Sequence, residues 1–232
     1  MTRRELLQSL AVGAAVSTIG SELQAQTPAA GGWQIKPLPF DPKKLKGLSE
    51  KLLVSHHDNN YAGAARRVGQ IQQMLAGLPN NAPGFQLKGL KMEELIATNS
   101  AILHEEYFGN LGGDGKASGS AQQALSQQFG GFDKWEQDFR ATSTALGGGS
   151  GWAILSFNFR DGKLHNTIAF DHTDNAAFGR PILVNDMFEH AYHMDYGSSA
   201  AMYIDAFMQN VNWDECNRRL EEANKMFAAL RH

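Results

Sequence analysis

One short stretch of the sequence, NDMFEHAYHMDYG at residues 185–197, mixes ionisable side chains with aromatic ones. Asp186, Glu189 and His190 stand there among methionine, phenylalanine and tyrosine. Charged side chains are seldom fully buried unless they pair with another charge or bind a metal, and aromatic neighbours indicate burial. The stretch therefore predicts a positively charged group that compensates Asp186 and engages His190.

Two further histidines could complete a metal site with this pair. His56 continues the apolar stripe of one helical pattern, and His104 lies near the middle of a second. If both helices pack against the segment that carries Asp186 and His190, three imidazoles and one carboxylate converge. That set suits iron, manganese or zinc and leaves an open position on a five-coordinate ion. The alternative for each histidine is an ordinary core residue, which is what a lone histidine on an apolar helix face usually is.

Two helices must position the first two histidines. Helical spacing runs from residue 48 to 77 in steps of four, and it returns from about residue 91 to 111. The positions that define the first stripe are Leu48, Leu52, His56, Asn60, Ala64 and Val68. Pro79 and Pro83 close the first helix, and glycines at 112 and 113 stop the second. The pattern predicts a helical hairpin.

The glycine-rich stretch GGDGKASGS at 112–120 marks the best domain boundary. Beyond it the sequence predicts two short helices, a hairpin of strands turning at Asp161-Gly162, a third strand at 180–186, and helices from Ala200 to the end. We therefore expect an α+β protein, with a helical hairpin domain at 26–117 and a C-terminal α/β domain at 118–232.

Composition and charge narrow the class of protein. The formal net charge is −3 and no lysine or arginine run is present in the 232 residues, which argues against nucleic acid or an acidic membrane surface as partner. The single cysteine, Cys216, excludes an intrachain disulfide. Residues 1–25, with Arg3-Arg4 and a small residue at Ala25, predict a twin-arginine export signal and hence a periplasmic protein. No other segment is long enough for a membrane span.

Residues 186–192, DMFEHAY, resemble the hallmark segment of the iron/manganese superoxide dismutases. LSEKLLVSHH, NSAILHEEYF, GSGWAIL and VNWDECNRRL match further family segments in the same order, so the resemblance covers nearly all of residues 36–220. It implies a helical hairpin followed by a domain with a three-stranded antiparallel sheet, superoxide as substrate, and a homodimer or tetramer. It also implies one iron or manganese ion per subunit, with the ligands His56, His104, Asp186 and His190.

The resemblance also implies roles around the ion. In most of the family a glutamine tunes the bound solvent; here the matching position is His172, as in a known subset, and Ser100 at the alternative position is too short. Trp152 is retained beside it. In the family's dimer, the residue at Glu189 reaches the ligand histidine of the partner subunit. The other residues expected at that interface are Tyr192 and Asn60.

The chain departs from the family pattern at the substrate gate. Asn60 and Ala64 stand where a histidine and a tyrosine are usual, and α-helical spacing puts both on the face of His56. Tyr61 points elsewhere unless the helix is distorted. Phe108 and Phe188 replace common tryptophans. Two alternatives stay open: a metal-holding protein with little turnover, and another non-haem iron enzyme, against which the third histidine argues. The choices between iron and manganese, and between dimer and tetramer, also stay open.

Overall fold

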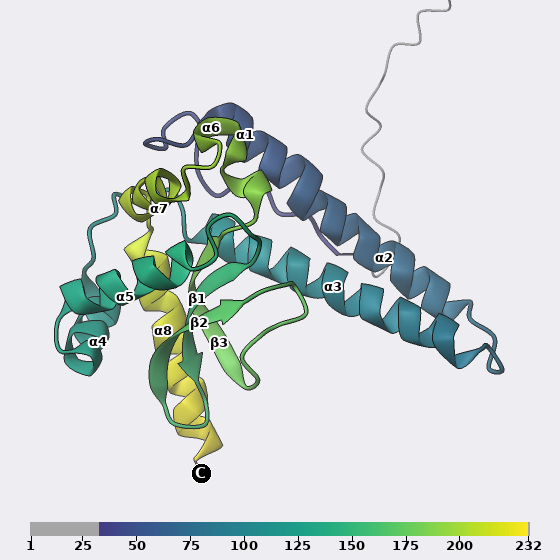
Figure 1. The fold of residues 1–232 in the computed structure, drawn as a ribbon. Helices are drawn as coiled ribbons and strands as arrows, with labels where there is room; N and C mark the ends of the chain where they lie inside the picture. The colour runs from purple at the N-terminus through teal and green to yellow at the C-terminus, as the bar shows by residue number, and fades with distance from the viewer. Residues whose placement is uncertain (1–32, 232) are drawn as a thin grey trace, which may run out of the picture.

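The computed structural model describes residues 33–231, and its N-terminal half is a pair of long helical rods. The first rod comprises α1 (Glu50–Ser55), a π-helical turn (His56–Tyr61) and α2 (Ala62–Ala76); α3 (Gly84–Gly109) runs back beside it (Figure 1). Ser49 caps the start of α1 by accepting a hydrogen bond from the backbone N–H of Leu52 at 3.1 Å. The predicted helical hairpin is confirmed.

The start of the second rod differs from the prediction. The first rod ends at Ala76, before Pro79, but α3 begins at Gly84, directly after Pro83, rather than near residue 91. Its first turns expose Phe85 and Leu87. Because those turns bury no apolar face, no apolar periodicity marks them in the sequence.

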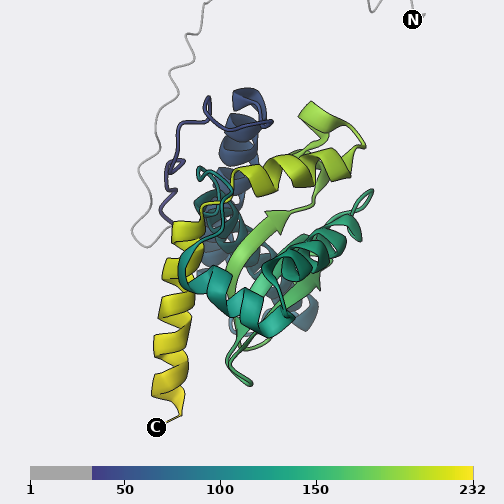
Figure 2. The same cartoon turned by 90° about the vertical axis from the view of Figure 1, so that its left-hand side faces the viewer.

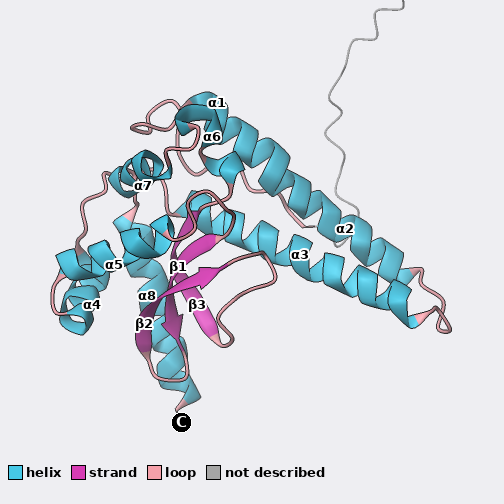
Figure 3. Cartoon of the chain, in the orientation of Figure 1, coloured by secondary structure: helices cyan, strands magenta, loops and turns pink. Residues whose placement is uncertain are grey.

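In the second half of the chain, two helices come before three β-strands and further helices follow them (Figure 3). The strands form one antiparallel sheet in the order β2-β1-β3, as expected. In this sheet Trp152, the first residue of β1, is paired with Asp186, the last residue of β3. The elements are α4 (Gly119–Phe129), α5 (Phe132–Thr144), β1 (Trp152–Asn158), β2 (Lys163–Ala169), β3 (Gly179–Asp186), α6 (His193–Tyr196), α7 (Ala200–Gln209) and α8 (Trp213–Leu230).

The glycine-rich stretch 112–120 is not wholly irregular, since α4 begins inside it at Gly119. Its glycines allow close backbone approach: a Cβ on Gly113 would lie 2.2 Å from the carbonyl oxygen of Val211. The stretch therefore brings the end of α3 against the segment between α7 and α8.

One hydrophobic core joins the two halves. α3 contacts β3, α5 contacts β1 and β2, and α8 contacts β3, so helices flank the sheet (Figure 2). Buried side chains from both halves belong to the same cluster, among them Leu53, Leu103, Tyr107, Trp152 and Val184. The seam between hairpin and sheet is thus a packed interior, which is where the four candidate ligands were expected to meet.

The predicted export segment, residues 1–25, lies outside the described residues. Among residues 33–231 no helix is both long and apolar enough to cross a membrane.

Candidate metal centre

Four segments of the chain each contribute one side chain to a cluster at this seam. His56 opens the π-helical turn, His104 lies on the inward face of α3, and Asp186 ends β3. A 3₁₀ turn, Glu189–Ala191, follows β3 and carries His190. The cluster therefore depends on the packing of the hairpin against the sheet and not on any single local motif.

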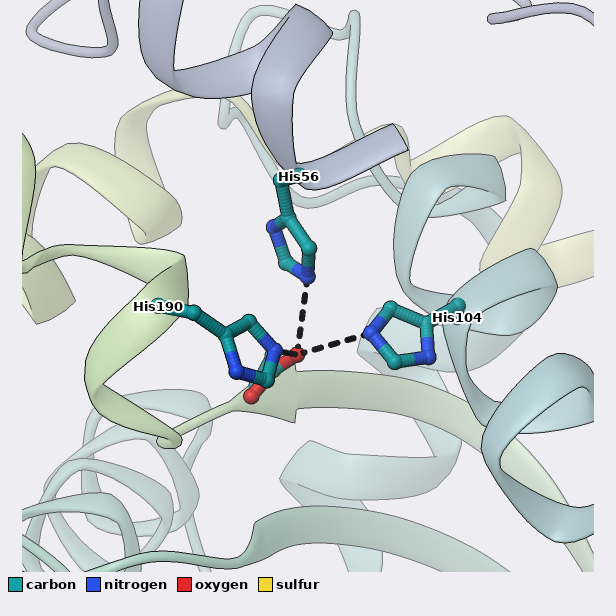
Figure 4. A group of neighbouring side chains, drawn as sticks. His56, His104 and His190 are labelled. Atoms are coloured by element: carbon teal, nitrogen blue, oxygen red, sulfur yellow. Dashed lines mark hydrogen bonds and ion pairs between the residues drawn. The ribbon is translucent and has the colours of Figure 1, made fainter. Parts of the chain in front are cut away.

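The three imidazoles converge on one carboxylate oxygen (Figure 4). Oδ2 of Asp186 lies 3.0 Å from Nε2 of His56, 3.4 Å from Nε2 of His190 and 3.6 Å from Nε2 of His104. One donor atom from each of the four residues lies within 4.8 Å of the others. A single ion placed among them is within reach of all four.

The donor atoms fit a metal ion. His56, His104 and Asp186 are buried, and the Nε2 atoms of His104 and His190 are buried without a hydrogen bond to any described residue. Unpaired buried polar atoms are rare because each one forfeits its hydration. Both point at the Asp186 carboxylate, so a cation bound at the centre satisfies them together. Three nitrogens and one oxygen are ligands that iron and manganese accept.

The electrostatics favour the metal-ready state of His56, His104 and Asp186, whereas the Asp186 charge raises the pKa of His190. Burial lowers the pKa of His56 and holds the pKa of His104 at about 3, so both imidazoles are neutral and keep a lone pair. Burial alone raises the pKa of Asp186, but the charge of the nearby His190 and the hydrogen bond from His56 hold that pKa well below its usual range. The buried carboxylate therefore requires a positive charge beside it, which a metal ion supplies.

Neighbouring groups orient the ligands. The carbonyl oxygen of Ser100 lies 2.7 Å from Nδ1 of His104 and can only accept, so Nδ1 carries the proton and Nε2 is free for the metal. Oδ1 of Asp186 accepts from the backbone N–H of Phe188 at 2.8 Å, which leaves Oδ2 facing the histidines. The Tyr203 hydroxyl donates to the carbonyl of Asp186 at 2.7 Å and fixes the end of β3.

Comparison with known proteins agrees with this geometry. Residues 117–219 match the family model for iron/manganese superoxide dismutases, C-terminal domain. The chain is 51% identical over 192 residues to a superoxide dismutase [Fe] of Cupriavidus metallidurans, which covers 82% of this chain and 98% of that relative. The chain belongs to the iron/manganese superoxide dismutase family. A superoxide dismutase [Fe] of Aquifex aeolicus is 33% identical, covering 82% of the chain and 92% of the relative. A superoxide dismutase [Mn] of Halobacterium salinarum is 30% identical, and the match covers 84% of this chain and 98% of the relative.

His172, which the sequence predicts at the position of the family's usual glutamine, lies beside the cluster. Its ring stacks on Phe188 at 4.7 Å between centroids and lies 6.2 Å from the ring of His104. Nε1 of Trp152 donates to Nδ1 of His172 at 3.1 Å. Because an indole N–H can only donate, Nδ1 is the acceptor, and the neutral ring carries its proton on Nε2. Burial lowers the pKa of His172, which favours this neutral form.

Two of the three residues expected at a subunit interface, Glu189 and Tyr192, differ in exposure. The Glu189 side chain is 57% exposed, and its nearest basic group in the described chain is His193, 4.0 Å away. Tyr192 is buried and stacks on Tyr203 at 5.1 Å between ring centroids. Glu189 is thus free to reach another subunit, whereas the ring of Tyr192 packs inside its own.

The spacing predicted for the gate positions is wrong. The turn from His56 to Tyr61 is π-helical, so it contains one residue more than an α-helical turn. The buried stripe moves accordingly from Leu52 and His56 to Tyr61 and Ala65, and the two positions predicted to continue it, Asn60 and Ala64, are only half-buried. Tyr61 is buried because the helix is distorted there.

A tyrosine pair behind the ligands was not singled out by the sequence reasoning. The Tyr107 ring lies 5.1 Å from the ring of His56, and the Tyr203 hydroxyl lies 3.2 Å from that of Tyr107. Burial raises the pKa of both phenols, so both keep their protons. Tyr107 could have been found, since it follows His104 by three residues and so shares its helix face; Tyr203 lies far away in the sequence and gave no such signal.

Proposed function

We propose that this protein is a superoxide dismutase that converts two superoxide anions and two protons into one molecule of oxygen and one of hydrogen peroxide. The observation that carries the proposal is the cluster of three imidazoles and one buried, ionised carboxylate, in which the unpaired Nε2 atoms of His104 and His190 face a common centre. Family membership supports the same activity.

Iron or manganese held by His56, His104, Asp186 and His190 would supply the one-electron redox chemistry of the reaction. The protein's own residues manage geometry and protons. Asp186 and the three histidines fix the ion at the seam, and Phe108 and Phe188 pack against the histidine rings and exclude water. His172, held by Trp152 with its proton on Nε2, presents a hydrogen-bond donor beside the cluster.

Two features support a homodimer in which each subunit completes the site of the other. Glu189 directly precedes the ligand His190, yet its carboxylate points out of the subunit. Asn60 follows the ligand His56 by less than one π-helical turn and is half-buried. Across a twofold interface Glu189 would accept a hydrogen bond from the partner's ligand histidine and raise its basicity. Asn60 would lie at the same interface, and Tyr192 would lie behind it with its ring inside its own subunit.

We further propose that the protein is exported to the periplasm by a twin-arginine signal in residues 1–25. Replacement of Arg3 and Arg4 by lysine tests this route. Export predicts that the wild-type protein is recovered shortened and in the periplasmic fraction, whereas the variant is retained at full length. Full-length protein in the cytoplasm for both would contradict it.

A second candidate function is a metal-holding protein with little turnover, which the half-buried Asn60 and Ala64 favour because neither replaces the phenol of the usual gate. Stopped-flow decay of superoxide separates the two. We expect iron-loaded or manganese-loaded protein to accelerate the decay over the apo-protein, and His104→Ala to fall to that blank. His165→Ala, at an exposed position away from the cluster, serves as the matched control. One tightly bound ion per chain with no decay above the blank would establish the metal-holding function instead.

A further inference from the structure

We propose that the segment Trp33–Lys36 forms a brace with Tyr61 and Glu105 that sets the position of the two ligand-bearing helices, so that Tyr61 and Glu105 are positioning residues for the metal centre. The inference rests on the proposed function in one respect, that the four ligands bind a metal ion, and it does not require that the bound ion turns over superoxide. None of these residues lies in the ligand cluster itself.

Glu105 joins three segments of the chain through one carboxylate. Its Oε1 accepts from Nε1 of Trp33 at 2.7 Å and from the Tyr61 hydroxyl at 2.8 Å, and its Oε2 pairs with Nζ of Lys36. Only 16% of the Glu105 side chain is exposed. Charge-assisted hydrogen bonds of this kind are stronger than neutral ones, and partial burial strengthens them further. The carboxylate therefore ties the N-terminal segment, the π-helical turn and α3 together.

The backbone of Lys36 makes a second set of bonds to the same turn. Its N–H donates to the Tyr61 hydroxyl at 2.9 Å, and its carbonyl oxygen accepts from Nε2 of His57 at 2.8 Å. Tyr61 thus accepts one hydrogen bond and donates another, to Glu105. Burial raises the pKa of Tyr61 to about 12, so its phenol keeps the proton that it donates.

The attachment points lie next to the ligands in the sequence. His57 directly follows His56, and Glu105 directly follows His104. Consecutive residues on a helix point about 100° apart, so the brace holds each helix from beside the metal rather than inside it. The Phe108 ring connects the two regions, with its centroid 5.0 Å from that of His56 and 5.6 Å from that of His57.

The π-helical turn explains why such support matters. A π-helical turn is rare and is most often kept at functional sites, where it places a side chain differently from an α-helix. Here it starts at the ligand His56 and ends at Tyr61. The hydrogen bonds of the Tyr61 hydroxyl, made to Lys36 and Glu105, hold the far end of the turn. We infer that they keep His56 at its distance from His104.

The test uses iron-loaded protein and two readouts other than activity: the rate of iron loss to a chelator and the electron paramagnetic resonance spectrum of the ferric ion. Tyr61→Phe removes the hydroxyl and keeps the ring, and Glu105→Gln removes the charge and keeps the shape. We expect each to speed iron loss by about tenfold, the lower end of the effect for groups that orient ligands, and to shift the ferric spectrum. The double variant should speed iron loss by less than the product of the two single effects, because both residues act in one network.

Glu94→Gln is the matched control, since it removes an ion pair with Lys91 on the same helix away from the brace; it should leave both readouts unchanged. If Tyr61→Phe or Glu105→Gln fails to fold, Trp33→Phe provides a milder test, because it removes only the hydrogen bond from Trp33 to Glu105. It should speed iron loss to a smaller extent than either of the other two variants. Lowered thermal stability with an unchanged iron-loss rate and an unchanged spectrum would overturn the proposal. Absence of superoxide decay in the wild type would contradict the proposed function and leave these readouts intact.

Discussion

At the scale of single residues, the proton of His172 is placed by its neighbour Trp152. The indole N–H donates to Nδ1 and leaves the proton on Nε2. We predict that Trp152→Phe, which keeps an aromatic ring, lets the proton move to Nδ1 and lowers the rate of superoxide decay by roughly 10- to 100-fold at equal iron content. Stopped-flow decay normalised to bound metal measures this. Trp213→Phe is the control, because the indole N–H of Trp213 makes no hydrogen bond to a described residue; equal losses in both variants would refute the assignment.

Cys216 gives a prediction about the reactivity of its thiol. Burial raises the pKa of its thiol to about 12. The thiolate is the reactive form, so at pH 8 only about one thiol in 10⁴ is ionised, against a substantial fraction for a free cysteine. We expect Cys216 to resist hydrogen peroxide, the product of the proposed reaction, and to resist thiol reagents in the native protein while reacting fully in denaturant. Rapid labelling of the folded protein at pH 8 would contradict this.

The sequence predicted the four candidate ligands but not the groups that orient them. His56, His104, Asp186 and His190 are residue types with few structural uses in apolar surroundings, so their chemistry is visible in the sequence. The positioning role of Glu105 cannot be predicted from the sequence, because a glutamate on a helix is ordinarily exposed to solvent. Its role depends on Trp33 and Tyr61, which lie 72 and 44 residues away along the chain.

At the scale of elements, the π-helical turn decides which residues face the metal. Spacing by four predicts one continuous stripe through His56, and nothing in the residue types of HHDNNY signals an extra residue in the turn. The strands were easier to predict, since alternation of apolar and polar residues around Asp161-Gly162 has no helical counterpart. Local periodicity thus identified elements, whereas the irregular turn required tertiary contacts to Lys36 and Glu105.

Deletion of one residue tests the π-helical turn. Removing Asn59, which is exposed, converts the turn to α-helical spacing and leaves Tyr61 and Ala65 on the buried face. We predict a folded protein with weakened iron binding, because only the geometry at His56 changes. Removing the exposed Arg66 instead rotates the buried Val68 and Ile71 by about 100° and should unfold the helix end. Iron titration and circular dichroism compare the two; unaltered iron binding without Asn59 would mean that the turn does not position His56.

At the scale of the whole molecule, the seam that holds the cluster is built from both halves of the chain. The ligands come from the first rod, α3 and the segment after β3, and one core packs beneath them. A bound ion therefore links the helical hairpin to the sheet, and ligand binding to the native state alone stabilises it by mass action. The expected dimer extends this logic, since Glu189 would link the site of one subunit to that of its partner.

The dimer can be tested through Glu189. If its carboxylate accepts a hydrogen bond from the partner's ligand histidine, Glu189→Ala removes a contact of the interface and of the metal site at once. We predict that this variant sediments as a monomer at concentrations where the wild type is a dimer, and that it holds iron about 10-fold more weakly. Glu221→Ala, at an exposed position on α8, should change neither property. A monomeric variant with full iron affinity would separate the interface from the site, and a dimeric variant with full affinity would place Glu189 outside both.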